Sequence, residues 1–257
     1  MDPFEVGILI LAGFFCGILN TLAGFGSIIS LAVYMDVLNI PGHIANATNR
    51  VNILASSNIA AYTFYKNGKL KLKGDIPYII VTLLGAIVGA VIASYVNEDQ
   101  FKVAFKYLLI PILLLLVSNP KKFMYVKEGE KSAPAWIILP LLFIIGIYAG
   151  FIQAGFGVLF LMIVVMLGRY NLVRSNALKI AVVAVYTFFV VGWFWWKGLI
   201  QWVPGLTMAI GQSVGGYITA KYLSNFENAN KVAYWFLILI LVLVIIKNFE
   251  LYTYVGL

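Results

Sequence analysis

The sequence predicts an all-α, polytopic helical membrane protein, and three observations support this fold class. The chain has 257 residues, of which 62% are hydrophobic and 11% charged, whereas soluble domains contain about 25% charged residues. Its apolar residues lie in long continuous runs and do not alternate with polar ones, as they would in the strands of a membrane barrel. A pattern that begins at Gly13 also returns at Gly146, which indicates two homologous halves.

About eight main transmembrane segments are expected, because most of the apolar runs approach the ~20 residues that a helix needs to cross a bilayer. The runs, each free or nearly free of charge, are residues 6–23, 53–65, 76–96, 107–117, 136–154, 180–196, 203–220 and 232–246. The first run follows acidic residues rather than the basic segment of a signal peptide. It is therefore expected to stay in the protein as a membrane segment.

The internal repeat divides the chain into residues 1–119 and 133–257, joined by a charged loop, residues 120–132, that is expected in the cytoplasm. In each half a Gly-xxx-Gly run leads to a Gly-Phe-Gly turn, followed by an Asn-Ala pair, an aromatic turn ending in glycine and a second Gly-xxx-Gly run. The Gly-xxx-Gly pairs are expected at close contacts between helices. Repeats of this kind are typical of secondary transporters, which bind their substrate near the membrane midplane between the repeats.

Each half opens with a stretch that is too long for one span, residues 4–40 and 135–170, and that its glycine turn interrupts. Such a stretch is either a broken helix that crosses once or a re-entrant hairpin that returns to its own side. The hairpin puts most of the 18 Lys and Arg residues on one side of the membrane, whereas a single crossing divides them almost evenly. The positive-inside rule therefore favours hairpins, which make the two halves inverted repeats with both termini outside.

The two glycine turns are candidate anion sites. Helices that begin at Gly26 and Ser27, and at Gly157, would direct unpaired N–H groups and their positive ends toward the bilayer centre. Gly24 and Gly155 allow a positive φ and close approach of a ligand to the backbone. A packing kink between helices is the alternative for both turns.

Three polar side chains lie next to these turns, deep in apolar runs: Asn20, Thr21 and Gln153. Polar groups at such depth need either a partner or a wet cavity, so all three are candidate substrate-binding residues. Hydrogen bonding between helices would explain them equally well.

The next helix of each half carries an asparagine followed by a base. Asn46, Asn49 and Arg50 stand at i, i+3 and i+4, and Asn176 and Lys179 repeat the pair at i and i+3. A cation and an amide from each half could hold one oxyanion, with Arg50 donating in bidentate fashion and Lys179 acting as a point charge. Arg50→Ala should then lower anion affinity without lowering the folded yield. Alternatively, either base marks a helix end and extends to the lipid headgroups.

Other features of the sequence limit the kinds of chemistry that the protein can carry out. His43, the single histidine, is a candidate for proton coupling, although a histidine near a loop is more often simply solvated. The single cysteine, Cys16, excludes a disulfide framework and a thiolate metal cluster, and no cofactor or metal is expected.

The sequence contains no phosphate-binding loop, His-Glu-xx-His motif or nucleophile elbow, which disfavours an ATP-driven pump and a membrane enzyme. The formal charge of +8 comes from bases in loops, and nucleic-acid binding is not expected.

In this repeated order of motifs the sequence resembles the sulfite exporter TauE/SafE family of bacterial membrane permeases. The resemblance covers essentially the whole chain and includes the turns that end at Gly68 and Gly198. It implies export of sulfite or small organosulfonates across the bacterial cytoplasmic (inner) membrane. The chain departs from the family pattern in having no proline soon after its first glycine turn, and its turns read Gly-Phe-Gly rather than an unbroken glycine run. These departures leave the choice of anion open.

The sequence thus predicts a secondary transporter that holds a small sulfur-containing oxyanion between two halves and works by alternating access. An anion channel and a non-transporting membrane scaffold are the alternatives. The expected partners are a small anion and the lipid bilayer, and assembly into a homo-oligomer is left open.

Overall fold

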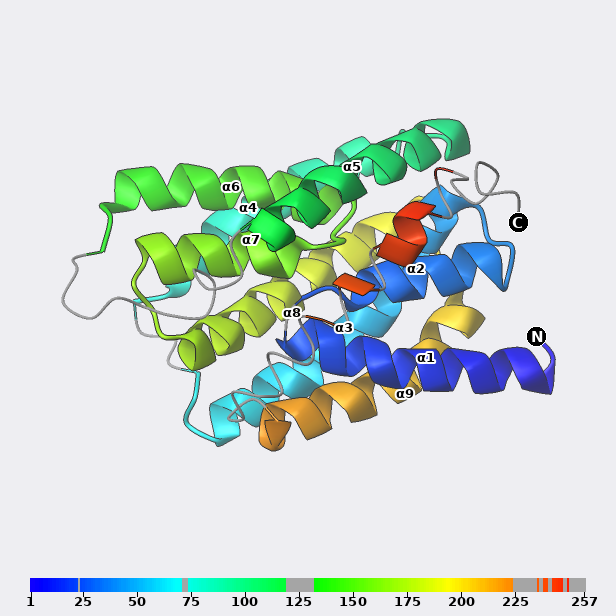
Figure 1. The fold of residues 1–257 in the computed structure, drawn as a ribbon, viewed down its shortest axis with the longest axis horizontal. Coiled ribbons are helices and arrows are strands. Elements are labelled where there is room, and N and C mark those ends of the chain that lie inside the picture. Colours follow the sequence, from blue (N-terminus) through cyan, green and yellow to red (C-terminus); the bar gives the residue numbers. More distant parts are fainter. Residues whose placement is uncertain are drawn as a thin grey trace.

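The described part of the chain is a bundle of helices whose axes mostly follow its longest dimension (Figure 1). The computed structural model describes residues 1–22, 24–70, 74–118, 132–223, 235, 238–239, 242–246 and 249, and these contain no β-strand. The first half contains α1 (Pro3–Leu22), α2 (Gly26–Asp36), α3 (Gly42–Lys66), α4 (Ile76–Ala93) and α5 (Glu98–Ser118). The second half contains α6 (Ala135–Phe151), α7 (Phe156–Met162), the π-helical η1 (Ile163–Leu167), α8 (Leu172–Trp196) and α9 (Trp202–Lys221). The predicted all-α class is confirmed for these residues.

Three of the helices, α1, α4 and α8, are long and apolar enough to cross a membrane. The helices α2 and α6 and the continuous α7–η1 segment are shorter but also apolar. Large apolar side chains such as Phe4, Ile144 and Phe188 are exposed, whereas the charged side chains of Arg50 and Lys179 are buried. This distribution suits a protein whose outer surface meets lipid and whose polar groups face the interior. The expected segment at residues 232–246 lies only partly within the described residues, which include 235, 238–239 and 242–246 of it.

Helices α3 and α8 begin earlier than the apolar runs suggested. Helix α3 begins at Gly42 and α8 at Leu172, each about two turns or more before its run. The added turns contain the polar residues that interrupted the runs, including Arg50 and Lys179, but in the bundle these residues face inward. Helix α8 is capped by Asn171, whose side chain accepts a 2.8 Å hydrogen bond from the Arg174 N–H.

The opening stretch of each half is a helical hairpin. Helix α2 returns along α1, with Gly26 so close to α1 that a Cβ on it would lie 2.8 Å from Cγ of Asn20. In the second hairpin the Ala133 N–H donates to the Leu167 carbonyl at 2.8 Å, so η1 ends beside the start of α6. Figure 1 shows α1 and α6 starting from opposite ends of the bundle. This geometry agrees with the hairpins that the charge distribution favoured.

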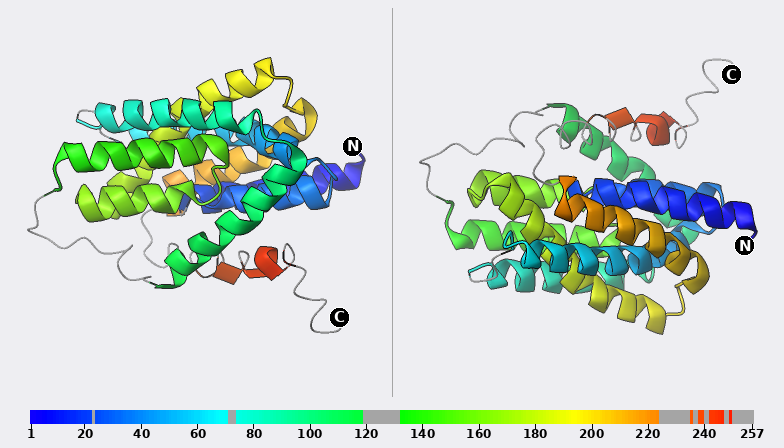
Figure 2. Two further views of the ribbon diagram at one scale, coloured as in Figure 1. Left: turned by 90° about the horizontal axis from the view of Figure 1, so that it is seen from above. Right: turned by 90° about the horizontal axis from the view of Figure 1, so that it is seen from below.

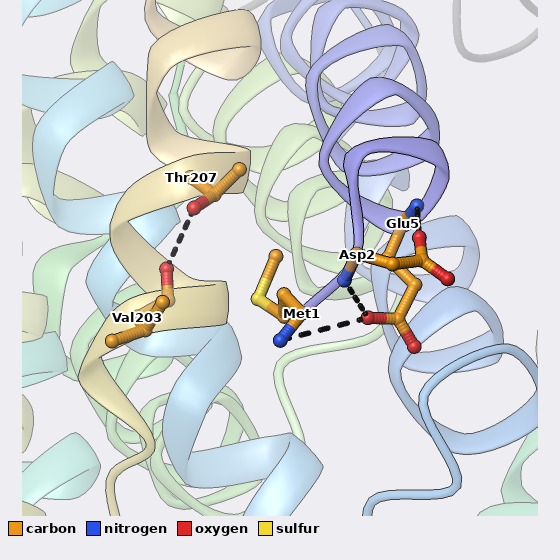
Figure 3. Close-up of polar contacts among 5 residues, drawn as sticks. All are labelled: Met1, Asp2, Glu5, Val203 and Thr207. Atoms are coloured by element: carbon orange, nitrogen blue, oxygen red, sulfur yellow. Dashed lines mark hydrogen bonds and ion pairs between the residues drawn. The ribbon is translucent and has the colours of Figure 1, made fainter.

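A reciprocal cap starts α1. The Glu5 N–H donates to Oδ1 of Asp2 at 2.7 Å, and the Asp2 N–H donates to Oε2 of Glu5 at 2.9 Å (Figure 3). Such an exchange satisfies two backbone donors that the first turn of a helix leaves without partners. Figure 3 also shows the start of α9 alongside, where the Thr207 hydroxyl donates to the Val203 carbonyl at 2.8 Å.

Two parallel helix pairs make backbone contact, and each pair takes one helix from each half. Helix α1 packs on α9, where a Cβ on Gly17 would lie 2.7 Å from the Gly216 nitrogen. Helix α4 packs on α6, where a Cβ on Gly150 would lie 2.8 Å from the Ala90 nitrogen. Small residues permit such close approach of helices within a membrane. The predicted packing role of the Gly-xxx-Gly pairs is thereby confirmed.

Helices α3 and α8 cross in the middle of the bundle and contact each other. Helix α3 also packs on α9, and α8 on α4, so these two helices connect the two glycine-packed pairs. Helix α5 runs obliquely to the remaining helices (Figure 2). The asparagine and cation pairs of α3 and α8 therefore lie inside the protein, next to the breaks of the two hairpins.

Candidate functional site

A small cavity of ≈ 20 Å³ lies where the two hairpin breaks meet α3 and α8. This volume is enough for about one water molecule. The wall contains both polar and apolar residues, which are Asn20, Thr21, Gly24, Ile53, Ser56, Ser57, Gln153, Phe156, Gly157, Lys179, Ile180 and Val183. Six of the predicted site residues are in this set: Asn20, Thr21, Gly24, Gln153, Gly157 and Lys179.

The two glycine turns touch each other at this cavity. A Cβ on Gly24 would collide with Cα of Gly157 and would lie 2.9 Å from its nitrogen. Gly24 has a φ of 81° and Gly155 a φ of 78°, in the left-handed region that favours glycine. Gln153 also has a positive φ, 61°, which is uncommon for a residue with a side chain. The breaks thus bring backbone from both halves into contact.

The breaks also leave helix N-termini beside the cavity. Helix α2 begins at Gly26 and α7 at Phe156, and neither has a side-chain cap. Within the described residues, the N–H groups of Gly26, Ser27 and Gly157 have no backbone acceptor outside their own helices. Such N–H groups and the positive end of the helix dipole can hold an anion. The side chain of Ser27 is buried, and its hydroxyl also has no hydrogen-bond partner among the described residues.

Lys179 supplies a buried cation to the cavity wall. Only 1% of its surface is exposed, and its Nζ donates to the Thr21 carbonyl at 3.1 Å and to Oδ1 of Asn176 at 3.0 Å. Thr21 is in the last turn of α1, so Lys179 satisfies a carbonyl that the helix end leaves free. An ammonium has three N–H donors, which leaves one for a ligand in the cavity.

Arg50 is fully buried but does not line the cavity. Its Nη1 donates to the Ala149 carbonyl at 2.8 Å and its Nη2 to the Gly150 carbonyl at 3.1 Å, both at the end of α6. The guanidinium also donates to Asn46 at 3.3 Å and to Oε1 of Gln153. Gln153 lines the cavity, so Arg50 contacts a residue of the wall but is not itself part of the wall.

The two cations therefore play matching structural parts. Each comes from the third helix of one half and binds carbonyl oxygens at the end of the opening helix of the other half. Asn46 adds a 2.8 Å hydrogen bond from its Nδ2 to the Phe151 carbonyl. Neither base extends to the lipid headgroups, because both are buried.

Among the described residues, neither Arg50 nor Lys179 forms an ion pair. The buried carboxylate of Asp75 lies at the end of the bundle, where its Oδ1 accepts 2.8 Å hydrogen bonds from Arg174 and from the Tyr170 hydroxyl. Burial, and then the bond to Asp75, raise the pKa of that Tyr170 hydroxyl. A buried charge is costly unless it is paired, so the centre of the bundle favours a bound anion.

A second polar network joins the cavity to α2 and α9. Oδ1 of Asn49 accepts from Ser30 at 2.6 Å and from Asn52 at 3.2 Å, and Asn52 also donates to Gln212. Gln212 in turn donates to the Ser56 hydroxyl at 3.0 Å, and Ser56 lines the cavity. Asn49 is therefore directed away from Arg50, although the two are neighbours in sequence.

Several predicted residues lie beside the cavity rather than in its wall: Gly26, Ser27, Asn46, Asn49, Arg50, Gly155 and Asn176. His43 is also not in the wall. It lies on α3 about two turns before Arg50. In the described ranges no three His, Cys, Asp or Glu side chains are grouped to hold a metal ion.

Sequence reasoning missed several wall residues. Ser56 and Ser57 stand within the apolar run of residues 53–65, a signal that hydropathy averaging hides. Gln212 and Asn52, which connect Ser56 to the second network, were also not among the predicted residues. The apolar part of the wall carries no such signal, because Ile53, Phe156, Ile180 and Val183 look like any membrane segment.

Comparison with known proteins bears on this arrangement. A family model described as "Sulfite exporter TauE/SafE" matches residues 9–247. The chain is 27% identical over 225 residues to the "Probable membrane transporter protein ORF9" of Sinorhizobium sp, covering 84% of this chain and 82% of the relative. It is 25% identical over 226 residues to the "Probable membrane transporter protein YfcA" of Escherichia coli strain K12, covering 86% and 81%.

A third relative, the "Probable membrane transporter protein YdhB" of Bacillus subtilis strain 168, is 24% identical over 225 residues, covering 84% of this chain and 89% of the relative. No solved structure matches the chain. The family match spans nearly the whole sequence, and the apolar helices agree with a multi-pass membrane protein. The chain therefore belongs to the sulfite exporter TauE/SafE family of membrane transporters.

Proposed function

We propose that this transporter carries a small sulfur-containing oxyanion, such as sulfite or an organosulfonate, which it holds in the central cavity between its two halves. The observation that carries the proposal is the buried ammonium of Lys179 in the cavity wall, which forms no ion pair with a described residue. It lies beside two helix N-termini, where the N–H groups of Gly26, Ser27 and Gly157 have no backbone acceptor outside their own helices among the described residues. A small oxyanion has several acceptor oxygens and would satisfy both kinds of donor.

Alternating access follows from the size of the cavity. A volume of ≈ 20 Å³ suits about one water molecule and is too small for an oxyanion of four or more heavy atoms. We infer that movement of one half against the other enlarges the cavity and admits the anion. The contact of Gly24 with Gly157 is where the two halves would separate.

The two halves, residues 1–119 and 133–257, are proposed to be inverted repeats. Three reciprocal features support this: α1 packs on α9 as α6 packs on α4, the two hairpin breaks meet, and each half caps the opening helix of the other. A two-fold axis in the membrane plane would produce all three. On this scheme most of the eight expected segments correspond to α1, α3, α4, α5, α6, α8 and α9.

Orientation follows from the charges at the two ends of the bundle. Lys66, Lys69, Arg174 and Lys221 share one end, because Lys69 contacts the Ala220 carbonyl and Arg174 binds Asp75. We propose that this basic end faces the cytoplasm, in the inner membrane of a bacterium, as the positive-inside rule requires. The relatives named above also come from bacteria.

Flux of labelled sulfite into proteoliposomes tests the proposal. Wild-type protein should give saturable uptake that unlabelled sulfite or one organosulfonate inhibits, whereas acetate should compete weakly. Uptake proportional to concentration, without counter-exchange, would favour an anion channel instead. Absence of flux for all sulfur oxyanions would reject this substrate class. Imposing and abolishing a proton gradient would show whether protons drive the transport.

A further inference from the structure

A second cavity lies toward the basic end of the bundle and shares no lining residue with the central one. It is a groove of ≈ 610 Å³ between the last turns of α3 and α9. We call it the lysine groove; its wall includes Ile59, Tyr62, Lys66, Tyr217 and Lys221. No step of the proposed transport cycle uses this groove.

We propose that the lysine groove binds the headgroup phosphate of an anionic phospholipid, with one acyl chain along the outer face of α9. This inference concerns a site separate from the central cavity and does not depend on the transported anion.

The charge of the groove favours a phosphate. Lys66 and Lys221 both line it, and neither forms an ion pair with a described residue. The Nζ of Lys221 is oriented by a 3.0 Å hydrogen bond to the Tyr217 hydroxyl, and it lies 4.9 Å from the ring centroid of Tyr222. Basic pockets between helices at the cytoplasmic face are typical binding sites for anionic headgroups.

An apolar stripe leads from the groove toward the middle of the bundle. Leu206, Ile210, Val214 and Tyr217 follow each other at helical spacing on α9, and all are exposed. The stripe ends at Lys221, and Ile59 of α3 continues the apolar surface beside it. A phosphate at the lysines would therefore have an acyl chain next to exposed apolar side chains. A free phosphate would use only the polar end of this surface.

The depth of the groove also fits a headgroup. Tyr62, Tyr65 and Tyr222 are exposed around it, and tyrosines concentrate at the level where the hydrocarbon core meets the headgroups. The same end of the bundle carries Lys69 and Arg174. In the proposed orientation this is the cytoplasmic leaflet, where anionic lipids attract basic side chains.

Native mass spectrometry of the full-length protein from detergent containing equal phosphatidylglycerol and phosphatidylcholine tests the proposal. Wild-type protein should retain phosphatidylglycerol preferentially. A lysine beside an anionic headgroup contributes about fivefold in affinity, so Lys66→Gln with Lys221→Gln should lower the ratio of the two retained lipids by about 25-fold. Each single substitution should lower it by about fivefold.

The matched control is Lys102→Gln with Lys197→Gln, which removes the same charge from the opposite end of the bundle and should leave the ratio unchanged. Equal retention of both lipids by wild-type protein, or an unchanged ratio in the groove variant, would overturn the proposal. Inorganic phosphate at millimolar concentration should not displace the bound lipid. Displacement would assign the groove to a soluble anion and reject the lipid.

Discussion

Arg50 of α3 donates a hydrogen bond to the side-chain oxygen of Gln153, in the break between α6 and α7. Through this bond a fully buried cation that serves as a helix cap is connected to a residue of the cavity wall. The main-chain φ of Gln153, 61°, is unusual for a residue with a side chain. Arg50 thus caps the end of α6 and also fixes the position of the Gln153 side chain in the break that follows.

Removal of this cap should lower stability. Arg50→Met leaves the carbonyl oxygens of Ala149 and Gly150 buried without their donors, and each unsatisfied group costs roughly 1–3 kcal/mol. We therefore expect the midpoint of thermal unfolding in detergent, and with it the folded yield, to fall clearly. This differs from the expectation based on the sequence alone, in which Arg50 only bound the anion.

Arg50→Lys restores one charged donor and should recover part of the loss. Lys102→Met, on an exposed turn of α5, is the control and should unfold like the wild type. If Arg50→Met unfolds at the wild-type temperature, the capping role is wrong.

Lys179 should affect transport more than stability. Lys179→Gln keeps an N–H donor for the Thr21 carbonyl but removes the charge from the cavity. Because a hydrogen bond to a charged group contributes roughly 1.5–3 kcal/mol, the concentration of sulfite that half-saturates uptake should rise about 10- to 100-fold. The concentration dependence of uptake into proteoliposomes measures this change.

Lys102→Gln serves again as the control, because it removes a positive charge from an exposed position that is not in the cavity wall. Half-saturation at the wild-type concentration in the Lys179→Gln protein would show that this ammonium does not bind the anion.

Local pattern was enough to predict the helical class, the hairpin breaks and the pairing of asparagine with a cation. Composition predicts the helical membrane class, because a chain with so few charged residues cannot cover a surface that faces water. Glycines such as Gly24 and Gly155 mark the breaks, because their positive φ is a local backbone requirement.

The exact composition of the cavity wall could not be predicted in this way. The contact of Gly24 with Gly157, and the bond of Arg50 to the Ala149 carbonyl, join segments about a hundred residues or more apart. Such pairings depend on how the two halves dock, and no local periodicity contains that information. The same reason explains why Arg50 was expected in the wall but lies behind it.

The contact between the glycine turns can be tested with a pair of alanine substitutions. Gly24 and Gly68 have similar backbone conformations, with φ of 81° and 69°. A Cβ on Gly24 meets the Gly157 backbone, whereas a Cβ on Gly68 has no atom of a described residue within 4 Å. Both substitutions carry the strain of a left-handed residue, about 1–2 kcal/mol, but only Gly24→Ala should add the cost of overpacking, ~1–3 kcal/mol.

Thermal unfolding and sulfite uptake should therefore be impaired more strongly by Gly24→Ala than by Gly68→Ala. Equal effects of the two substitutions would mean that the turns do not touch.

The packing of α4 on α6 offers a comparison between two helical glycines. A Cβ on Gly89 would collide with the Ile147 carbonyl oxygen and lie 2.8 Å from the Phe151 nitrogen, whereas a Cβ on Gly192 of α8 would have no atom within 4 Å in the part of the chain that the structure describes. In an open helical position alanine stabilises by about 0.5–1 kcal/mol relative to glycine, so Gly192→Ala should raise the unfolding midpoint slightly. Gly89→Ala should lower it, because α4 and α6 must move apart and lose contacts along their length, at a cost of ~1–3 kcal/mol. Thermal unfolding of both variants in the same detergent measures the difference, and a rise in both midpoints would contradict backbone contact between α4 and α6.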